Sequence, residues 1–284
     1  HRLYALLFNV EDLCSPESIK ICSKMKEYIG DRWESVLKSN KLDDFESLWE
    51  LEAGWFEEPN KRRGGWSGVS RVSLKAENGG VVSVFLKRQE NHNTKVWNRP
   101  LKGIPTFYKE FKNIQRFIDC GIPTVELVYF GYRYVKGNSQ SILITKELEG
   151  FASLDAAIYS RGGLLMQNRD RREEMMGAIV DGMRKMHNYR FQHNCLYDKH
   201  IFVRQVGGEW EVKFIDLEKL SRSFFQKSAV IRDLYTLTRH VSGGWRLSDK
   251  LKCFKIYMQE EKLSPKSKSI WREIHNKMKA KNKL

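Results

Sequence analysis

The chain of 284 residues is long enough for one large domain or two small ones, and its 15 Phe, 11 Tyr and 8 Trp exclude an intrinsically disordered protein. Its net charge is +15, but residues 1–60 carry 7 basic against 13 acidic side chains, so the positive excess lies in residues 61–284. No run of residues approaches the roughly 18 apolar side chains that a membrane-spanning helix needs.

The five cysteines show no paired spacing and no zinc-binding pattern. This predicts free thiols in a reducing compartment, and therefore a cytoplasmic protein. A strongly basic balance is typical of proteins that bind nucleic acid, an anionic membrane or an anionic substrate, and composition alone leaves these three classes open.

Residues 61–87 have the pattern of a β-hairpin. An alternating strand over 69–74 is followed by Asn78-Gly79, and this dipeptide supports the positive φ of a tight turn. A return strand is predicted over 81–87.

A glycine-rich segment, Gly64-Gly65-Trp66-Ser67-Gly68, stands before the first strand of this hairpin. Glycines let a backbone approach phosphates closely, and exposed N–H groups bind oxyanions. Because these glycines precede a strand rather than a helix, they argue against a P-loop or a dinucleotide-binding fold. A plain flexible turn is the alternative interpretation.

Lys87 ends the return strand, and a helix predicted over 105–118 contains Glu110. A lysine on a strand can bind phosphate when a carboxylate holds it in place. Arg88 competes with Lys87 for this role. The alternative is that both the lysine and the glutamate are ordinary surface charges.

The rest of the chain turns from strands to helices. A second hairpin is predicted over 125–148. Further elements are helices over 170–189, 228–241, 248–260 and 265–281 and two short strands over 201–204 and 210–215. This order predicts an α+β fold with two lobes.

The segment 193–203 gathers residues that can carry chemistry. His193, Cys195, Asp198 and His200 lie between a long helix and a strand, and Asp216 directly follows the next apolar strand. An acid at the carboxyl end of a strand is a usual metal ligand. Structural histidines and a turn aspartate are the alternatives.

The order of these parts is that of a protein-kinase-like fold. In that fold a glycine-rich hairpin covers ATP and a Lys–Glu pair holds the phosphates. A loop then supplies a base and a metal ligand, and a later Asp binds Mg²⁺.

Six segments resemble the Kdo/WaaP family of lipopolysaccharide kinases, and within it the InaA-like branch: 58–69, 87–89, 121–125, 143–148, 193–203 and 215–219. The resemblance divides the chain into an extension over 1–44, an N-lobe over 45–148 and a helical C-lobe with a basic tail over 149–284. It implies a bacterial kinase that uses ATP and Mg²⁺ to phosphorylate a sugar of the lipopolysaccharide core. A peripheral contact with the inner membrane is left open.

The resemblance also implies roles for individual residues. The residues implied to bind ATP are Gly65, Ser67, Gly68, Lys87, Glu110 and Glu147, and Glu147 belongs to a hinge over 142–148. Asp216 and His200 are implied to bind the metal, and Asp198, Cys195 and Asp216 to act in catalysis. His193 and Asp233 are implied to support the loop.

One position departs from the family pattern. Cys195 stands where active members of the wider fold carry the Asp that orients the acceptor hydroxyl and accepts its proton, and a thiol is a poor acceptor. Asp198 is the only carboxylate in the loop and is our hypothesis for a substitute base. His200 stands where an Asn is usual, and nitrogen is a second-choice ligand for Mg²⁺.

Three functions therefore compete. The first is a lipopolysaccharide-core kinase whose basic surface meets an anionic glycolipid or another sugar acceptor. The second is a nucleotide-binding pseudokinase in an envelope or acid-stress response, favoured by Cys195. The third is a nucleic-acid binder. Because the basic tail 262–284 has Trp271 as its single aromatic residue, no stacking platform is visible and a nucleic-acid partner is not expected.

Overall fold

The computed structural model of the chain describes residues 21–22, 25–62, 64–96, 99–159, 163, 167–241 and 245–281. Residues 1–20 and 23–24 of the expected extension and residues 282–284 of the basic tail are not among those described. The chain forms two compact units, His1–Asn93 with Val128–Ile144 and Thr94–Leu127 with Thr145–Leu284. The chain passes from the first unit to the second for the last time between Ile144 and Thr145, inside the segment 142–148 that is expected as a hinge.

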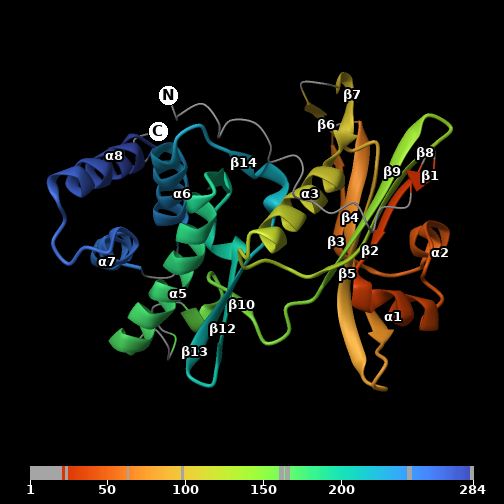
Figure 1. Cartoon of the computed structure of the whole chain (residues 1–284), viewed down its shortest axis with the longest axis horizontal. Helices are drawn as coiled ribbons and strands as arrows, with labels where there is room; N and C mark the ends of the chain where they lie inside the picture. Colours follow the sequence, from red (N-terminus) through yellow and green to blue (C-terminus); the bar gives the residue numbers. More distant parts are fainter. Residues whose placement is uncertain are drawn as a thin grey trace, which may run out of the picture. The chain divides into compact units, whose positions relative to one another are not determined.

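The first unit is built on an antiparallel sheet (Figure 1). In the described residues its order is β1-β2-β8-β9-β5-β4-β3. The strands are β1 (Ile21–Cys22), β2 (Met25–Ile29), β3 (Trp55–Arg62), β4 (Gly65–Lys75), β5 (Val81–Glu90), β8 (Leu127–Val135) and β9 (Asn138–Lys146). Both predicted hairpins are confirmed, and their turns contain Gly79 at φ 78° and Gly137 at φ 85°.

Two short helices, α1 (Glu34–Ser39) and α2 (Phe45–Glu50), pack on one face of this sheet. Asp44 caps α2 by accepting the backbone N–H of Ser47 at 2.7 Å. Leu37 and Leu48 from these helices share one buried cluster with Leu86 of β5. Since alternate residues of a strand point to opposite faces, the helix-covered face also receives the side chain of residue 88 but not that of residue 87.

The second unit is mostly helical (Figure 1). Its helices are α3 (Thr106–Asp119), α5 (Arg169–Asn188), α6 (Gln226–His240), α7 (Leu247–Met258) and α8 (Pro265–Lys281), with short 3₁₀ turns η2 (Ala157–Tyr159), η3 (Asp198–His200) and η4 (Leu217–Lys219). Its short strands are β7 (Arg99–Pro105), β10 (Ala152–Ser153), β11 (Phe191–Gln192), β12 (Ile201–Val206), β13 (Glu209–Phe214) and β14 (Ser221–Arg222), and β6 (Asn93–Val96) pairs with β7 at the start of the unit.

Periodicity predicted the long helix α5 well. Met175, Ile179, Met183 and Met186 were expected on one face, and all four are buried. Its N-cap is Asn168, whose side-chain oxygen accepts the N–H groups of Asp170 and Arg171.

The expected apolar face of α3 needs one correction. Ile118 follows the spacing of Phe107 and Ile114, yet its side chain is 48% exposed, whereas Phe117 is fully buried. Residue 117 lies three positions after Ile114 and ten after Phe107, so it stays on the buried stripe while residue 118 has turned past it.

The predicted α+β class is confirmed by these two units. None of the helices in the described residues has the length and hydropathy to cross a bilayer.

Candidate functional site

The loop between β11 and β12, residues 193–200, is held by a buried carboxylate from α6. Asp233 is fully buried and accepts the backbone N–H groups of His193 at 2.7 Å and Asn194 at 3.0 Å. The Asn194 backbone stands at φ 67°, a left-handed conformation that asparagine tolerates well. The Asn194 side chain donates to the carbonyl of Lys219 and to the hydroxyl of Ser221, which ties the loop to the segment after Asp216.

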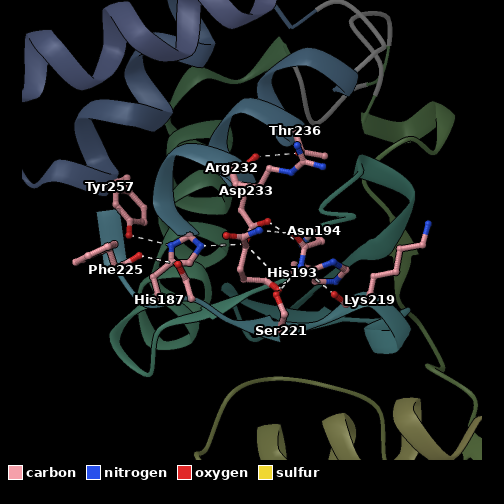
Figure 2. A network of polar contacts seen from close by, with 12 residues as sticks. His187, His193, Asn194, Lys219, Ser221, Phe225, Arg232, Asp233, Thr236 and Tyr257 are labelled. Carbon is pink, nitrogen blue, oxygen red and sulfur yellow. Dashed lines mark hydrogen bonds and ion pairs between the residues drawn. The ribbon is translucent and has the colours of Figure 1, made fainter. Parts of the chain in front are cut away.

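Behind this carboxylate lies a second pair of buried polar groups, shown in Figure 2. His187 Nε2 is 3.2 Å from Asp233 Oδ2, and His187 Nδ1 is 2.9 Å from the hydroxyl of Tyr257. Burial raises the pKa of Tyr257, so its hydroxyl keeps its proton and can donate to Nδ1. Nε2–H then donates to Asp233, and the network connects α7, α5 and α6 with the loop.

Asp216 follows β13 with its backbone fixed on both sides. The N–H of Ile215 donates to the carbonyl of His200 at 3.1 Å, and the Leu217 carbonyl accepts the Asn113 amide of α3 at 2.7 Å. Asp216 itself has φ 58° and ψ 56°, a left-handed conformation that costs roughly 1 kcal/mol or more for a residue with a Cβ. The surrounding hydrogen bonds hold it there, and its side chain is 43% exposed.

His200 faces Asp216 in a way that favours a positive charge between them. His200 Nδ1 is 2.8 Å from the Cys195 carbonyl, so Nδ1 must carry a hydrogen and donate it. Nε2, which in the neutral ring is then a bare lone pair, lies 3.3 Å from Asp216 Oδ2. Two acceptors at this distance repel unless a proton or a metal cation stands with them.

The donor set of this pair therefore fits a divalent cation in part. Asp216 offers the carboxylate that Mg²⁺ prefers and His200 an imidazole nitrogen. No group of three or more metal-binding side chains gathers in the part of the chain that the structure describes. Such a site depends on further oxygens from a phosphate or from water, as is usual for Mg²⁺ in kinase sites.

His193 is fully buried beside this pair. Its Nε2 is 3.0 Å from the carbonyl of Ile215, so Nε2 donates, and its ring stacks on that of His200 at 6.2 Å between centroids. Burial is the main cause that lowers the pKa of His193, which keeps the imidazole neutral. The ring thus fixes the backbone immediately before Asp216.

The two candidates for the acceptor side are both buried. Cys195 is 6% exposed, and its carbonyl accepts the N–H of Tyr197 as well as Nδ1 of His200. Asp198 is 7% exposed, and its carboxylate accepts the N–H of Lys199 at 3.0 Å. The pKa of His240 is lowered by burial, and Asp198 acts on it in the opposite direction.

In the first unit Lys87 and Arg88, the two candidates for a phosphate contact, lie on opposite faces of the sheet. Arg88 is 7% exposed and donates from one guanidinium nitrogen to the carbonyls of Trp49 and Leu51, both at 2.8 Å. It thereby satisfies carbonyls at the end of α2, on the helix-covered face. Arg88 is therefore committed to packing, whereas Lys87 points to the opposite face of the sheet. The role of Lys87 at a phosphate stays a prediction.

The glycines of the first unit have a structural reason of their own. A Cβ on Gly65 would lie 2.0 Å from the backbone oxygen of Glu90, and one on Gly68 would lie 2.5 Å from the ring of Trp55. Strand β4 therefore needs glycine at both positions, whether or not a ligand approaches. Ser67, between them, is half-buried.

The two predicted glutamates both belong to the second unit. Glu110 lies in α3 and is 5% exposed, and Glu147 follows β9 and is half-buried. The pairing of Glu110 with Lys87 and the role of Glu147 beside a nucleotide stay predictions.

The network behind the loop contains residues that sequence reasoning missed. His187 lies four positions after Met183 on the buried face of α5, so the helical period signalled it. Tyr257 and Asn113 gave no such signal, because their partners His187 and Leu217 lie 70 and 104 residues away in the chain.

Comparison with known proteins shows the family and the fold of this chain. The family model described as the lipopolysaccharide kinase (Kdo/WaaP) family matches residues 46–257. Protein InaA of Escherichia coli (strain K12) is 30% identical over 203 residues, which cover 72% of this chain and 90% of that protein. The structure of WaaP in complex with acyl carrier protein has a TM-score of 0.63 at 18% identity and covers 90% of this chain and 97% of that one. At that identity the likeness shows a common fold.

Proposed function

This chain belongs to the lipopolysaccharide kinase (Kdo/WaaP) family, and on that premise we propose that it transfers a phosphoryl group from ATP to a sugar hydroxyl of the lipopolysaccharide core. The observation that carries the proposal is the pair His200 and Asp216, whose Nε2 and Oδ2 atoms lie 3.3 Å apart on a backbone fixed by buried hydrogen bonds. Such a pair favours a cation at the carboxyl end of β13.

In this proposal Asp216 and His200 hold Mg²⁺ together with phosphate oxygens of ATP. Bound there, the cation offsets the negative charge on the transferring phosphoryl group. The chain's own contribution is positional: Asp233, His193 and Asn113 fix the backbone around the ligands, so little reorganisation is needed when the phosphates arrive.

On the nucleotide side we assign the phosphates to Lys87, held by Glu110, because Arg88 is already engaged with backbone carbonyls. The adenine side is assigned to the segment 142–148 with Glu147. A compact ammonium suits this role, since lysine acts as a mobile point charge on phosphate.

On the acceptor side the proposal is less simple. Asp198 is the carboxylate of the loop, but it already accepts the Lys199 N–H and is 7% exposed. Its low exposure, more than this one hydrogen bond, restricts the access of an acceptor hydroxyl to the carboxylate. The thiol of Cys195 is a weak acceptor, and this favours the alternative function, a nucleotide-binding pseudokinase that does not transfer phosphate efficiently.

A contact with an anionic surface is also part of the proposal. Lys266, Lys268 and Arg272 of α8 are exposed, while Ile270 and Ile274 are buried. Each basic side chain near an anionic membrane contributes on the order of 1 kcal/mol of attraction. The related WaaP was solved with acyl carrier protein, so a carrier protein is a second partner to test.

The test is a transfer assay with γ-labelled ATP, Mg²⁺ and purified lipopolysaccharide. The wild-type chain should label the core, Asp216→Asn should reduce the rate at least about 100-fold, and Asp181→Asn, an exposed carboxylate of α5, serves as a matched control. Nucleotide binding without label transfer would favour the pseudokinase. Full activity of Asp198→Asn would remove Asp198 as the base.

A further inference from the structure

The loop between β14 and α6 presents the two most exposed large hydrophobic side chains of the described residues. Phe224 is 91% exposed and Phe225 is 73% exposed. They are adjacent in the chain, eight and nine residues after Asp216, and belong to the same unit (Figure 2 labels Phe225). We call this pair the aromatic tip.

The tip is held outward by its own backbone. The N–H of Ser223 donates to the carbonyl of Arg190 at 2.8 Å, and the Ser223 hydroxyl donates to the carbonyl of Phe225 at 2.9 Å. The same Phe225 carbonyl accepts the N–H of Ser228 at 3.1 Å in the first turn of α6. With β14 paired to β11 on the other side, the exposure of the two rings is a property of an ordered turn.

Basic residues flank the tip in the sequence. Residues 219–232 contain no acidic residue and four exposed basic ones, Lys219, Arg222, Lys227 and Arg232. Arg190, whose carbonyl holds Ser223, adds a further exposed cation. Two acidic residues belong to the same surroundings: Glu218 directly precedes Lys219 in the chain, and Asp119 of α3 raises the pKa of the Cys120 thiol while Arg222 lowers it.

The apolar area of the tip argues against a protein partner. A phenylalanine buries on the order of 150–250 Å², so two rings supply roughly half of the approximately 800 Å² that a stable protein interface takes from each side. A bilayer needs no matched surface, because aromatic rings enter the boundary between headgroups and acyl chains while nearby cations attract anionic headgroups.

We propose that Phe224 and Phe225 insert into the interface of an anionic lipid bilayer, with Arg190, Arg222 and Lys227 on its phosphate groups. This inference deepens the membrane contact proposed above and rests on it, but it requires no phosphoryl transfer. It adds to the exposed basic residues of α8 a second contact, on the turn after Asp216, the proposed metal ligand. The acceptor sugar of a membrane-bound glycolipid is thereby brought to the unit that holds Asp216.

The experiment measures co-sedimentation of the full chain, without nucleotide, with vesicles of phosphatidylcholine alone or mixed with phosphatidylglycerol. The double variant Phe224→Ser/Phe225→Ser is compared with Phe56→Ser, a 60% exposed phenylalanine of the first unit. The wild type should bind the mixed vesicles. The double variant should lose at least about tenfold in affinity, and Phe56→Ser should stay within about twofold of wild type.

Two further variants separate the contributions. Arg222→Gln/Lys227→Gln should weaken binding to mixed vesicles several-fold and reduce the effect of added salt on the binding that remains. Asp216→Asn should bind vesicles like wild type, because it changes the chemistry and not the tip. Circular dichroism and the unfolding temperature show whether each exposed substitution leaves the fold intact.

The outcomes are distinct. Equal vesicle affinity of the wild type and the double variant would overturn the proposed role of the tip and assign the membrane contact to another surface such as α8. Absence of vesicle binding by the wild type would overturn both the tip and the membrane contact, while the transfer assay would still judge the kinase proposal. Concentration-dependent self-association that the double variant abolishes would assign the tip to a second copy of the chain instead.

Discussion

Replacing Asp233 by Asn tests how the candidate site is held. One carboxylate oxygen accepts the N–H of His193 at 2.7 Å and Nε2–H of His187 at 3.2 Å, and the other accepts the N–H of Asn194 at 3.0 Å. An amide keeps one accepting oxygen, and its NH₂ group must then face at least one of these donors. The variant therefore loses at least one hydrogen bond and leaves a buried donor unsatisfied.

The magnitude follows from these contacts. A hydrogen bond to a charged group contributes about 1.5–3 kcal/mol, and an unsatisfied buried donor costs a similar amount. We expect a loss of about 3 kcal/mol or somewhat more in the free energy of unfolding. For a domain of 150–250 residues this lowers the unfolding temperature by roughly 6–12 °C.

Differential scanning calorimetry measures this change. Asp181→Asn is the matched control, because Asp181 is an exposed aspartate of α5 in the same unit, and its unfolding should change by less than about 0.5 kcal/mol. If Asp233→Asn unfolded within about 2 °C of the wild type, the loop would not depend on this carboxylate, and the account of the site's rigidity would be wrong.

Three other substitutions have defined outcomes by the same measurement. Tyr257→Phe removes the partner of His187 Nδ1 at 2.9 Å and should cost about 1–2 kcal/mol; an unchanged unfolding temperature would mean that the buried imidazole finds another donor. Gly65→Ala places a Cβ 2.0 Å from the oxygen of Glu90 and should destabilise the first unit, which an unchanged unfolding temperature would contradict. Gly177→Ala, in α5 with nothing within 4 Å of the new Cβ, should raise stability by about 0.5–1 kcal/mol, and a loss would show a packing constraint at that helix position.

Patterns with a short period were predictable from the sequence. The hairpins around Gly79 and Gly137 followed from turn chemistry, and the buried face of α5 followed from helical spacing. Even there one residue of α3 was misplaced, because Ile118 and Phe117 are both apolar and only the full rotation of the helix decides which one is buried.

Contacts between distant segments were not predictable by the same means. Alternation along β5 could not decide between Lys87 and Arg88 until α2 was placed on one face of the sheet. The bonds from Asn113 to the carbonyl of Leu217 and from Tyr257 to His187 join helices whose approach depends on the tertiary structure. Neither residue type nor spacing carries that information.

The central claim is phosphoryl transfer at Asp216, and the most direct measurement is the mass of the lipopolysaccharide core after incubation with the chain, ATP and Mg²⁺. Our account predicts a core that is one phosphate heavier with the wild type and unchanged in mass with Asp216→Asn, while both proteins show the same unfolding profile. An unmodified core with folded, nucleotide-bound wild type would contradict it, as would a phosphorylated core produced equally by Asp216→Asn.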